Sequence, residues 1–294
     1  MTTSIDVAGY LRRLRLPHLD DSAPSIEGLF ALHRAHAELV PYETLEIWLG
    51  RPTTVDPAES AGRILRGRGG YCFHLNGAFS ALLTALGYRV TRHFGGVQNT
   101  TSRSAGATGN HLVLTVAGLP SAEAPEGRWL ADLGMGDGLH EPLPLTPGAF
   151  RQGPFAYGLR ESIAEPGGWR FDHDPRGSFL GMDFRAGPTG MAAFAEMHDF
   201  LSTSPESGFV RALAIIRRDA TGCDVLRGLT LTRLGDPETH RVLDRRADWF
   251  AAVSDIFGLP LDDVTPAERD ALWRRLTEAH EQWLARAADQ PRGV

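Results

Sequence analysis

Cysteine is scarce in this chain: there are two among 294 residues, Cys72 and Cys223. Two cysteines cannot build the disulfide framework of a small secreted protein, so a reducing compartment, the cytoplasm, is the expected setting. Neither cysteine belongs to a Cys-x-x-Cys pair, and no zinc-type pair of histidines occurs. The sequence therefore gives no support for a metal site.

Long apolar runs and an excess of positive charge are missing too. No run approaches the roughly 20 apolar residues that cross a bilayer, so we expect no membrane span. The start of the chain has no basic segment that leads into an apolar one, so no secretory signal is predicted. The 36 acidic residues outnumber the 30 basic ones, and the net charge is −6. Because nucleic-acid binding requires a basic face, no nucleic-acid partner is expected.

The pattern of apolar residues changes twice along the chain. Residues 5–86 repeat at helical spacing, residues 88–184 alternate short β-rich segments with Gly and Pro turns, and residues beyond 191 mix both patterns. The middle section suggests a small antiparallel sheet or barrel, so the sequence predicts an α+β protein. We expect helices at 58–66, 191–201, 248–257 and 266–287, and strands at 88–97, 111–116, 128–133, 178–184, 212–217 and 223–232.

The most informative stretch is residues 66–77, which place a cysteine between a glycine-rich turn and an apolar helix. Gly69 and Gly70 allow the chain to bend sharply before the helix begins. Cys72 is therefore expected in the first helical turn, where unpaired amides and the positive end of the dipole favour the reactive thiolate. The alternative is that Cys72 is a small buried apolar residue, as many free cysteines are.

Two later segments carry a histidine and an aspartate. Residues 110–116 alternate like a strand that starts at His111, and residues 129–136 resemble a second short strand that contains Asp132. A carboxylate within an apolar strand needs a partner, and a histidine is a suitable one. Together the three residues supply a nucleophile, a base and an orienter. Taken singly, His111 could be a surface histidine at a strand edge, and Asp132 could cap a turn before Gly134.

Five segments of the chain carry a family resemblance. Arg-Gly-Gly-Tyr-Cys at 68–72, Asn-His-Leu-Val-Leu at 110–114 and Ala-Asp-Leu-Gly-Met-Gly at 131–136 hold the three residues above. With Val-Pro-Tyr-Glu-Thr-Leu at 40–45 and the segment 199–209, they resemble elements of the arylamine N-acetyltransferase family and come in the family's order. The chain departs from the family pattern at three positions, where His74 replaces a usual Glu, Met135 a usual Phe and Thr44 a usual Asn.

The resemblance implies three parts in chain order. They are an N-terminal helical bundle over residues 1–87, a central antiparallel β-barrel over 88–190 and a C-terminal α/β lid over 191–294, around a catalytic core like that of cysteine proteases. It also implies an enzyme that moves an acetyl group from acetyl-CoA to an arylamine or arylhydrazine through an acetyl-cysteine. No metal takes part in that chemistry.

The resemblance also suggests binding residues. Val97, Gly134, Met135 and Phe209 would line the acyl and arylamine pocket. Thr108, Gly109 and Phe209 are the candidate CoA contacts, although Thr108 and Gly109 could equally form an ordinary turn before the strand. His74 is expected to face away from the site as a buried, hydrogen-bonded residue, because it lies two residues past Cys72 on a helix.

Three other functions stay open on the sequence. An amide synthase of the same superfamily, which closes a macrolactam from a carrier-bound polyketide, would share the triad. A cysteine hydrolase would use the same residues with water as the acceptor. A non-catalytic binding protein on this scaffold is disfavoured, because all three catalytic residue types are present.

Overall fold

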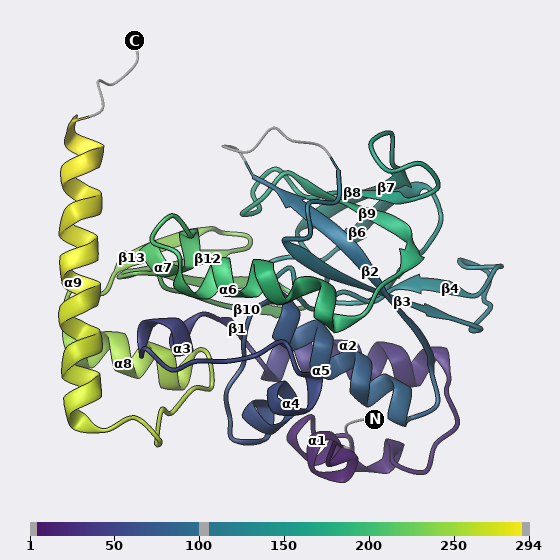
Figure 1. Ribbon diagram of the computed structural model, residues 1–294, viewed down its shortest axis with the longest axis horizontal. Coiled ribbons are helices and arrows are strands. Elements are labelled where there is room, and N and C mark those ends of the chain that lie inside the picture. The colour runs from purple at the N-terminus through teal and green to yellow at the C-terminus, as the bar shows by residue number, and fades with distance from the viewer. Residues whose placement is uncertain (1–4, 100–105, 290–294) are drawn as a thin grey trace.

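Helices form the first part of the chain, as the spacing of its apolar residues predicted. The computed structural model describes residues 5–99 and 106–289. Asp56 caps the fourth helix by accepting a 2.9 Å hydrogen bond from the Ala58 amide, and Pro57 occupies its first turn. The helices, in the lower half of Figure 1, are α1 (Val7–Arg13), η1 (Pro17–Leu19), α2 (Ile26–Leu39), α3 (Leu45–Trp48), α4 (Pro57–Leu65) and α5 (Cys72–Ala85).

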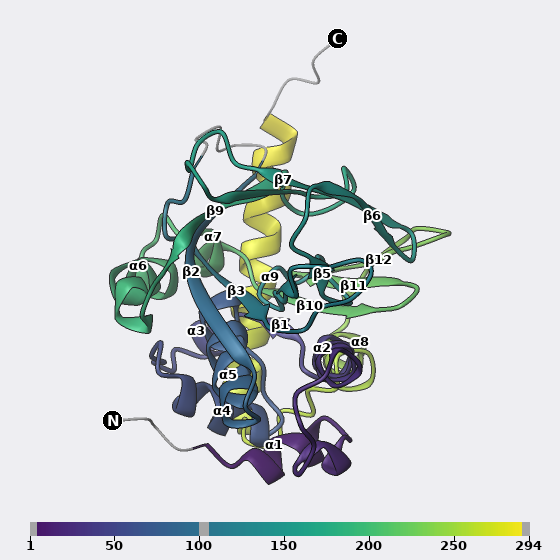
Figure 2. The same cartoon turned by 90° about the vertical axis from the view of Figure 1, so that its right-hand side faces the viewer.

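Eight antiparallel strands follow and curve into a near-closed barrel (Figure 2). Their order across the sheet is β5-β4-β3-β2-β9-β8-β7-β6, and buried aromatic and aliphatic side chains fill the interior. The strands are β2 (Arg89–Gln98), β3 (His111–Ala117), β4 (Arg128–Leu130), β5 (Leu143–Pro144), β6 (Gly148–Gln152), β7 (Phe155–Glu161), β8 (Trp169–Asp172) and β9 (Gly181–Pro188).

A second antiparallel sheet, ordered β1-β10-β11-β12-β13, forms the last part together with helices. Its edge strand β1 comes from the helical part of the chain, and there Tyr42 pairs with Ile216. The long helix α9 stands at one side of the molecule (Figure 1). The elements are η2 (Met191–Phe194), α6 (Ala195–Thr203), α7 (Gly208–Arg211), β1 (Tyr42–Glu43), β10 (Ala214–Asp219), β11 (Gly222–Arg227), β12 (Thr230–Leu234), β13 (Thr239–Val242), α8 (Arg246–Asp255) and α9 (Pro266–Asp289).

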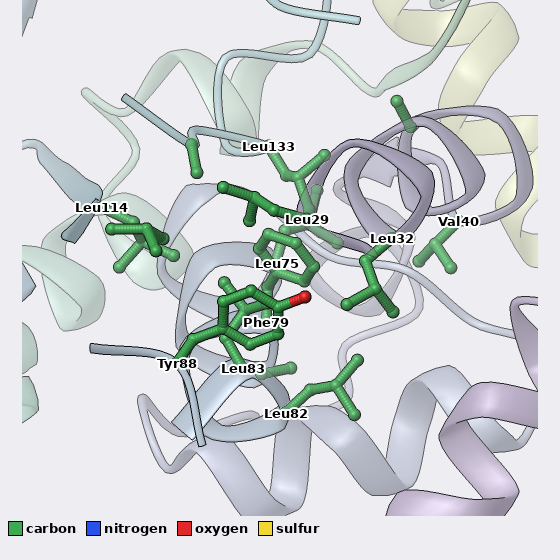
Figure 3. Close-up of a cluster of buried hydrophobic side chains, with 14 of the residues drawn as sticks. Leu29, Leu32, Val40, Leu75, Phe79, Leu82, Leu83, Tyr88, Leu114 and Leu133 are labelled. Atoms are coloured by element: carbon green, nitrogen blue, oxygen red, sulfur yellow. The ribbon is translucent and has the colours of Figure 1, made fainter. Parts of the chain in front are cut away.

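An apolar core between α2 and α5 holds the start of α5 in place (Figure 3). Burying such side chains contributes about 1.5–3 kcal/mol each. Because β3 and the turn after β4 pack into the same core, α5 is fixed against both. The labelled side chains are Leu29, Leu32, Val40, Leu75, Phe79, Leu82, Leu83, Tyr88, Leu114 and Leu133.

The predicted α+β class, with N-terminal helices, a barrel and a C-terminal sheet with helices, is confirmed, but some strands differ. The prediction of one strand over 223–232 is wrong, since the chain turns at Gly228, with φ of 56°, between β11 and β12. The strand predicted over 128–133 ends at Leu130. The boundaries of the three parts, at 87/88 and 190/191, remain a prediction.

Among residues 5–99 and 106–289, no helix combines the length and the apolar character needed to cross a bilayer.

Candidate active site

Cys72 is the first residue of α5, as predicted, and its side chain is 3% exposed. The glycine turn before it is tightly packed, because a Cβ at Gly69 would collide with the Pro41 carbonyl oxygen. The His74 side chain accepts from the amide of Tyr71, the N-cap residue, and no hydrogen bond among the described residues uses the amides of Cys72 or Phe73. These free amides point along the helix start, where negative charge is stabilised.

His111 opens β3 and is buried rather than exposed at a strand edge. Its Nε2 lies 2.8 Å from Oδ2 of Asp132, and Sγ of Cys72 lies 3.6 Å from the carbonyl oxygen of the preceding residue, Asn110. Burial disfavours the charged ring, but the carboxylate and the thiol outweigh burial and raise the pKa of His111 to about 10. The site thus favours the imidazolium that forms when His111 takes a proton from sulfur.

Asp132 lies in a turn two residues after β4, not inside a strand as predicted. Oδ1 accepts hydrogen bonds from the Gly134 amide at 2.8 Å and from Nδ2 of Asn76 at 2.7 Å, while Oδ2 faces His111. Asp132 is fully buried, and these bonds replace the water its charge would otherwise need. The carboxylate therefore both caps the turn and contacts the histidine, which the sequence had offered as alternatives.

Gly134 packs directly on the helix that carries Cys72. A Cβ at position 134 would lie 2.8 Å from Cα and Cβ of Cys72, and 2.8 Å from Nδ2 of Asn76. Real Cβ atoms do not approach other heavy atoms so closely. Only glycine therefore fits between the turn and the helix.

We expect Gly134→Ala to destabilise the protein by about 1–3 kcal/mol, the usual effect of forcing an extra methyl group into a packed site. Alkylation of Cys72 should also slow, because the helix start must shift. Gly187→Ala is the matched control, since nothing lies within 4 Å of its added Cβ. Thermal unfolding and iodoacetamide labelling measure the two effects, and equal behaviour of the two variants would contradict the packing described.

Asn110 joins the barrel to the nucleophile. Its side chain exchanges two hydrogen bonds with the backbone of Val97, at 2.7 and 3.1 Å, and its carbonyl oxygen lies 3.6 Å from Sγ of Cys72. Asn110 precedes His111 in the sequence, but no role was predicted for it. The feature that could have pointed to Asn110 is its position: it is a polar residue directly before a strand that begins with the candidate base.

The residues predicted to line the pocket lie in different surroundings. Gly134 touches Cys72 as described, and Met135, 5% exposed, belongs with Val97 to the apolar cluster of the barrel interior. The Phe209 ring lies 5.1 Å from that of Tyr71, the residue before Cys72. Phe209 thus lies near the residue before the nucleophile, and the substrate roles of these residues remain a prediction.

Two of the three candidate CoA contacts, Thr108 and Gly109, lie in the turn before β3. The Gly109 amide donates to the Gly95 carbonyl at 2.9 Å, and Gly109, with φ of 83°, leaves no room for a Cβ beside the Phe94 ring. Thr108 is exposed. Outside the undescribed stretch 100–105, no hydrogen bond or ring contact links either residue to Phe209, so their role in CoA binding remains a prediction.

His74 is buried behind the glycine turn. Its Nδ1 accepts a 3.4 Å hydrogen bond from the Tyr71 amide, whereas Nε2 has no partner among the residues that the structure describes. Burial and the nearby Arg63 guanidinium lower the pKa of His74 well below its ordinary value. The ring is therefore neutral and helps to hold the turn.

Cys223 offers a contrast to Cys72. It lies in β11, is fully buried, and burial, together with the nearby Asp137 carboxylate, raises the pKa of its thiol well above the ordinary value. A thiol of this kind is unreactive. In residues 5–99 and 106–289, no three His, Cys, Asp or Glu side chains are grouped as metal ligands.

Comparison with known proteins places the chain in a family. Residues 25–265 match the family model described as N-acetyltransferase. The arylamine N-acetyltransferase of Mycolicibacterium smegmatis is 31% identical over 279 residues, which cover 89% of this chain and 94% of that protein. This chain belongs to the arylamine N-acetyltransferase family.

Other members of the arylamine N-acetyltransferase family and one synthase show further similarity. The Mycobacterium marinum arylamine N-acetyltransferase in complex with CoA superimposes with a TM-score of 0.80 at 25% identity, covering 93% of this chain and 99% of that one. The proansamycin X synthase of Amycolatopsis mediterranei is 30% identical over 165 residues, 54% of this chain and 58% of that protein.

Proposed function

We propose that this N-acetyltransferase-family enzyme moves an acetyl group from acetyl-CoA to an arylamine or arylhydrazine, with Cys72, His111 and Asp132 as its catalytic residues. The observation that carries the proposal is the buried, hydrogen-bonded pair of Asp132 and His111 beside Cys72, which opens α5. Acetyl-CoA as the donor is supported by the family relative that binds CoA.

The first half of the reaction acetylates the enzyme. His111 takes the thiol proton, and the sulfur of Cys72 forms a bond to the carbonyl carbon of the acetyl thioester. The free amides of Cys72 and Phe73 are the candidate donors to the oxyanion that results, and one such donor contributes about 3 kcal/mol in other enzymes. The bond from carbon to the CoA sulfur then breaks, and the departing thiolate takes the proton back from His111.

The second half transfers the acetyl group to the amine. The amine nitrogen attacks the acetyl-cysteine carbonyl and gives a proton to His111, and the carbon–sulfur bond breaks to release the amide product. Splitting the transfer in this way lets one pocket hold the two substrates in turn. Phe209 and Met135, with aromatic and apolar surfaces, suit a flat arylamine better than an aliphatic amine.

The deciding experiment is intact mass measurement after incubation with acetyl-CoA in the absence of amine. We expect one added acetyl group on the wild type and none on Cys72→Ser. The chain contains no lysine, since all 30 basic residues are arginine, so side-chain amines cannot mimic the signal. Initial rates should give parallel lines when both substrates vary, whereas an unmodified mass with intersecting lines would mean direct transfer between bound substrates.

A prediction concerns Met135, where this chain departs from the family pattern. A flexible Met adapts to bulky acceptors, but lacks the ring stacking of Phe, which is about 0.5–1.5 kcal/mol. Met135→Phe should therefore tighten small arylamines by up to about tenfold and exclude bulky ones, while leaving acetylation of Cys72 nearly unchanged. Specificity constants for a graded series of para-substituted anilines measure this, and an unchanged ranking would mean that residue 135 does not touch the acceptor.

A macrolactam-forming amide synthase is the second candidate, because the chain is similar to proansamycin X synthase over about half its length. Such an enzyme would acylate Cys72 from a carrier-bound chain, and the amine would come from the other end of that chain. Rapid turnover of acetyl-CoA with a simple arylamine favours the first proposal. Acylation by a carrier-bound thioester but not by acetyl-CoA favours the second.

A further inference from the structure

Asn76 touches all three parts of the candidate site. It lies one helical turn after Cys72 on α5 and is fully buried. Its Nδ2 donates to the Leu112 carbonyl at 2.6 Å and to Oδ1 of Asp132 at 2.7 Å. Its Oδ1 accepts from the Leu133 amide at 2.9 Å. One side-chain amide therefore joins the helix of the thiol, the strand of the histidine and the turn of the carboxylate.

The orientation of the Asn76 amide follows from its partners. The Leu133 amide can only donate, so it must face the side-chain oxygen. A carbonyl and a carboxylate can only accept, so they must face the two protons on Nδ2. Both protons and the oxygen are used, which leaves no freedom for the amide to flip.

The turn after β4 contacts both Cys72 and Asn76 of α5. Gly134 packs against Cys72, while Asp132 and Leu133 hydrogen-bond Asn76. Residues four apart on a helix lie about 6 Å apart along the axis and share a face. Cys72 and Asn76 therefore contact the same turn from one face of α5.

We propose that Asn76 is a positioning residue, which fixes the Asp132 carboxylate so that Oδ2 faces His111. This inference rests on the proposed catalytic roles of Asp132 and His111. Without the Asn76 donor, Oδ1 keeps only the Gly134 amide and the carboxylate can rotate. His111 would then lose the partner that selects its tautomer and stabilises its charged form.

The test measures the rate of Cys72 alkylation by iodoacetamide in a Cys223→Ser background. We expect Asn76→Ala to slow it by about tenfold or more, the effect of losing one hydrogen bond to a charged group. In an Asp132→Ala background, Asn76→Ala should slow alkylation by less than about twofold, because the carboxylate that Asn76 positions is gone. Equal losses in both backgrounds would overturn the proposal, because a merely structural effect does not depend on Asp132.

Asn76→Asp adds a pH readout. Aspartate keeps the acceptor for Leu133, but it places a second carboxylate beside Asp132, and two such groups share one proton. When protonated, the new side chain can again donate to Asp132. The alkylation rate relative to wild type should therefore recover as the pH falls from about 8 to about 5. A ratio that does not change with pH would contradict the role.

Ser80→Ala is the matched control. Ser80 is buried on the same helix and hydrogen-bonds Gly77 and Arg92, away from the three catalytic candidates. The Ser80→Ala variant should be less stable than the wild type but should show the same rate of Cys72 alkylation. If the Asn76 variants do not fold, NMR of the wild type decides: the Asn76 side-chain amide signals must shift when His111 titrates, and constant signals overturn the proposal.

The two proposals fail in distinguishable ways. A wild-type Cys72 no more reactive than a free thiol would contradict the catalytic assignment itself. A reactive Cys72 that is unaffected by Asn76 variants would contradict only the positioning role.

Discussion

Asp132→Asn should slow acetylation of Cys72 by at least about 10²-fold, and the reason lies in the direction of its hydrogen bonds. Asn76 and the Gly134 amide both donate to Oδ1, so an amide at position 132 must place its oxygen there. Its NH2 group then faces Nε2 of His111. A donor at that place forces the histidine proton onto the other nitrogen, which can then no longer accept the thiol proton.

The magnitude follows from related chemistry. The equivalent change in a serine protease costs about 10⁴-fold, and a thiol is more acidic than a serine hydroxyl, so some reactivity should survive here. Rapid mixing with acetyl-CoA and a colour reagent for free CoA measures the step. Asp183→Asn is the control, because Asp183 is a buried carboxylate bonded to Ser162 and Arg170 in the barrel. A folded Asp132→Asn variant with a near-wild-type rate would falsify the orienting role.

The second large effect is selective inactivation through one thiol. With iodoacetamide below one equivalent at neutral pH, Cys72 should be labelled first, and activity should disappear in proportion to labelling. Cys72 has a helix start and a histidine beside it, whereas burial raises the pKa of the Cys223 thiol. Thiolate is the form that reacts.

Two variants separate the thiols. Cys223→Ser should keep both the labelling rate and the activity, because the Cys223 side chain is fully buried in β11. Cys72→Ser should lose both. Peptide mapping after partial labelling identifies the modified residue, and preferential labelling of Cys223 with loss of activity would contradict the assignment of the nucleophile.

Local sequence signals predicted the helix start well. A glycine turn followed by apolar residues at helical spacing places Cys72 within a few residues, because both signals act over one or two turns. The alternation after His111 defined β3 for the same reason. Where a short-range pattern determines the backbone, the sequence is sufficient.

Long-range contacts explain what the sequence left out. The strand before Asp132 ends early, because the turn that follows is held by Asn76, which lies 56 residues away along the chain. In the sequence, Asn76 is only a polar residue inside an apolar helix. Its three partners are known only once helix, strand and turn are assembled, so neither its role nor the exact place of Asp132 could be read beforehand.

The pairing of β1 with β10 bears on how the chain can be divided. Tyr42 and Glu43 cover the edge of β10, and the Thr44 amide donates to the Ala214 carbonyl at 3.1 Å. A fragment that starts at residue 191 would lack this cover and expose an apolar edge strand containing Ile215 and Ile216. Bare edges of this kind recruit other strands and drive aggregation. Such a fragment should become soluble when a peptide spanning residues 40–45 is supplied, by donation of the missing strand.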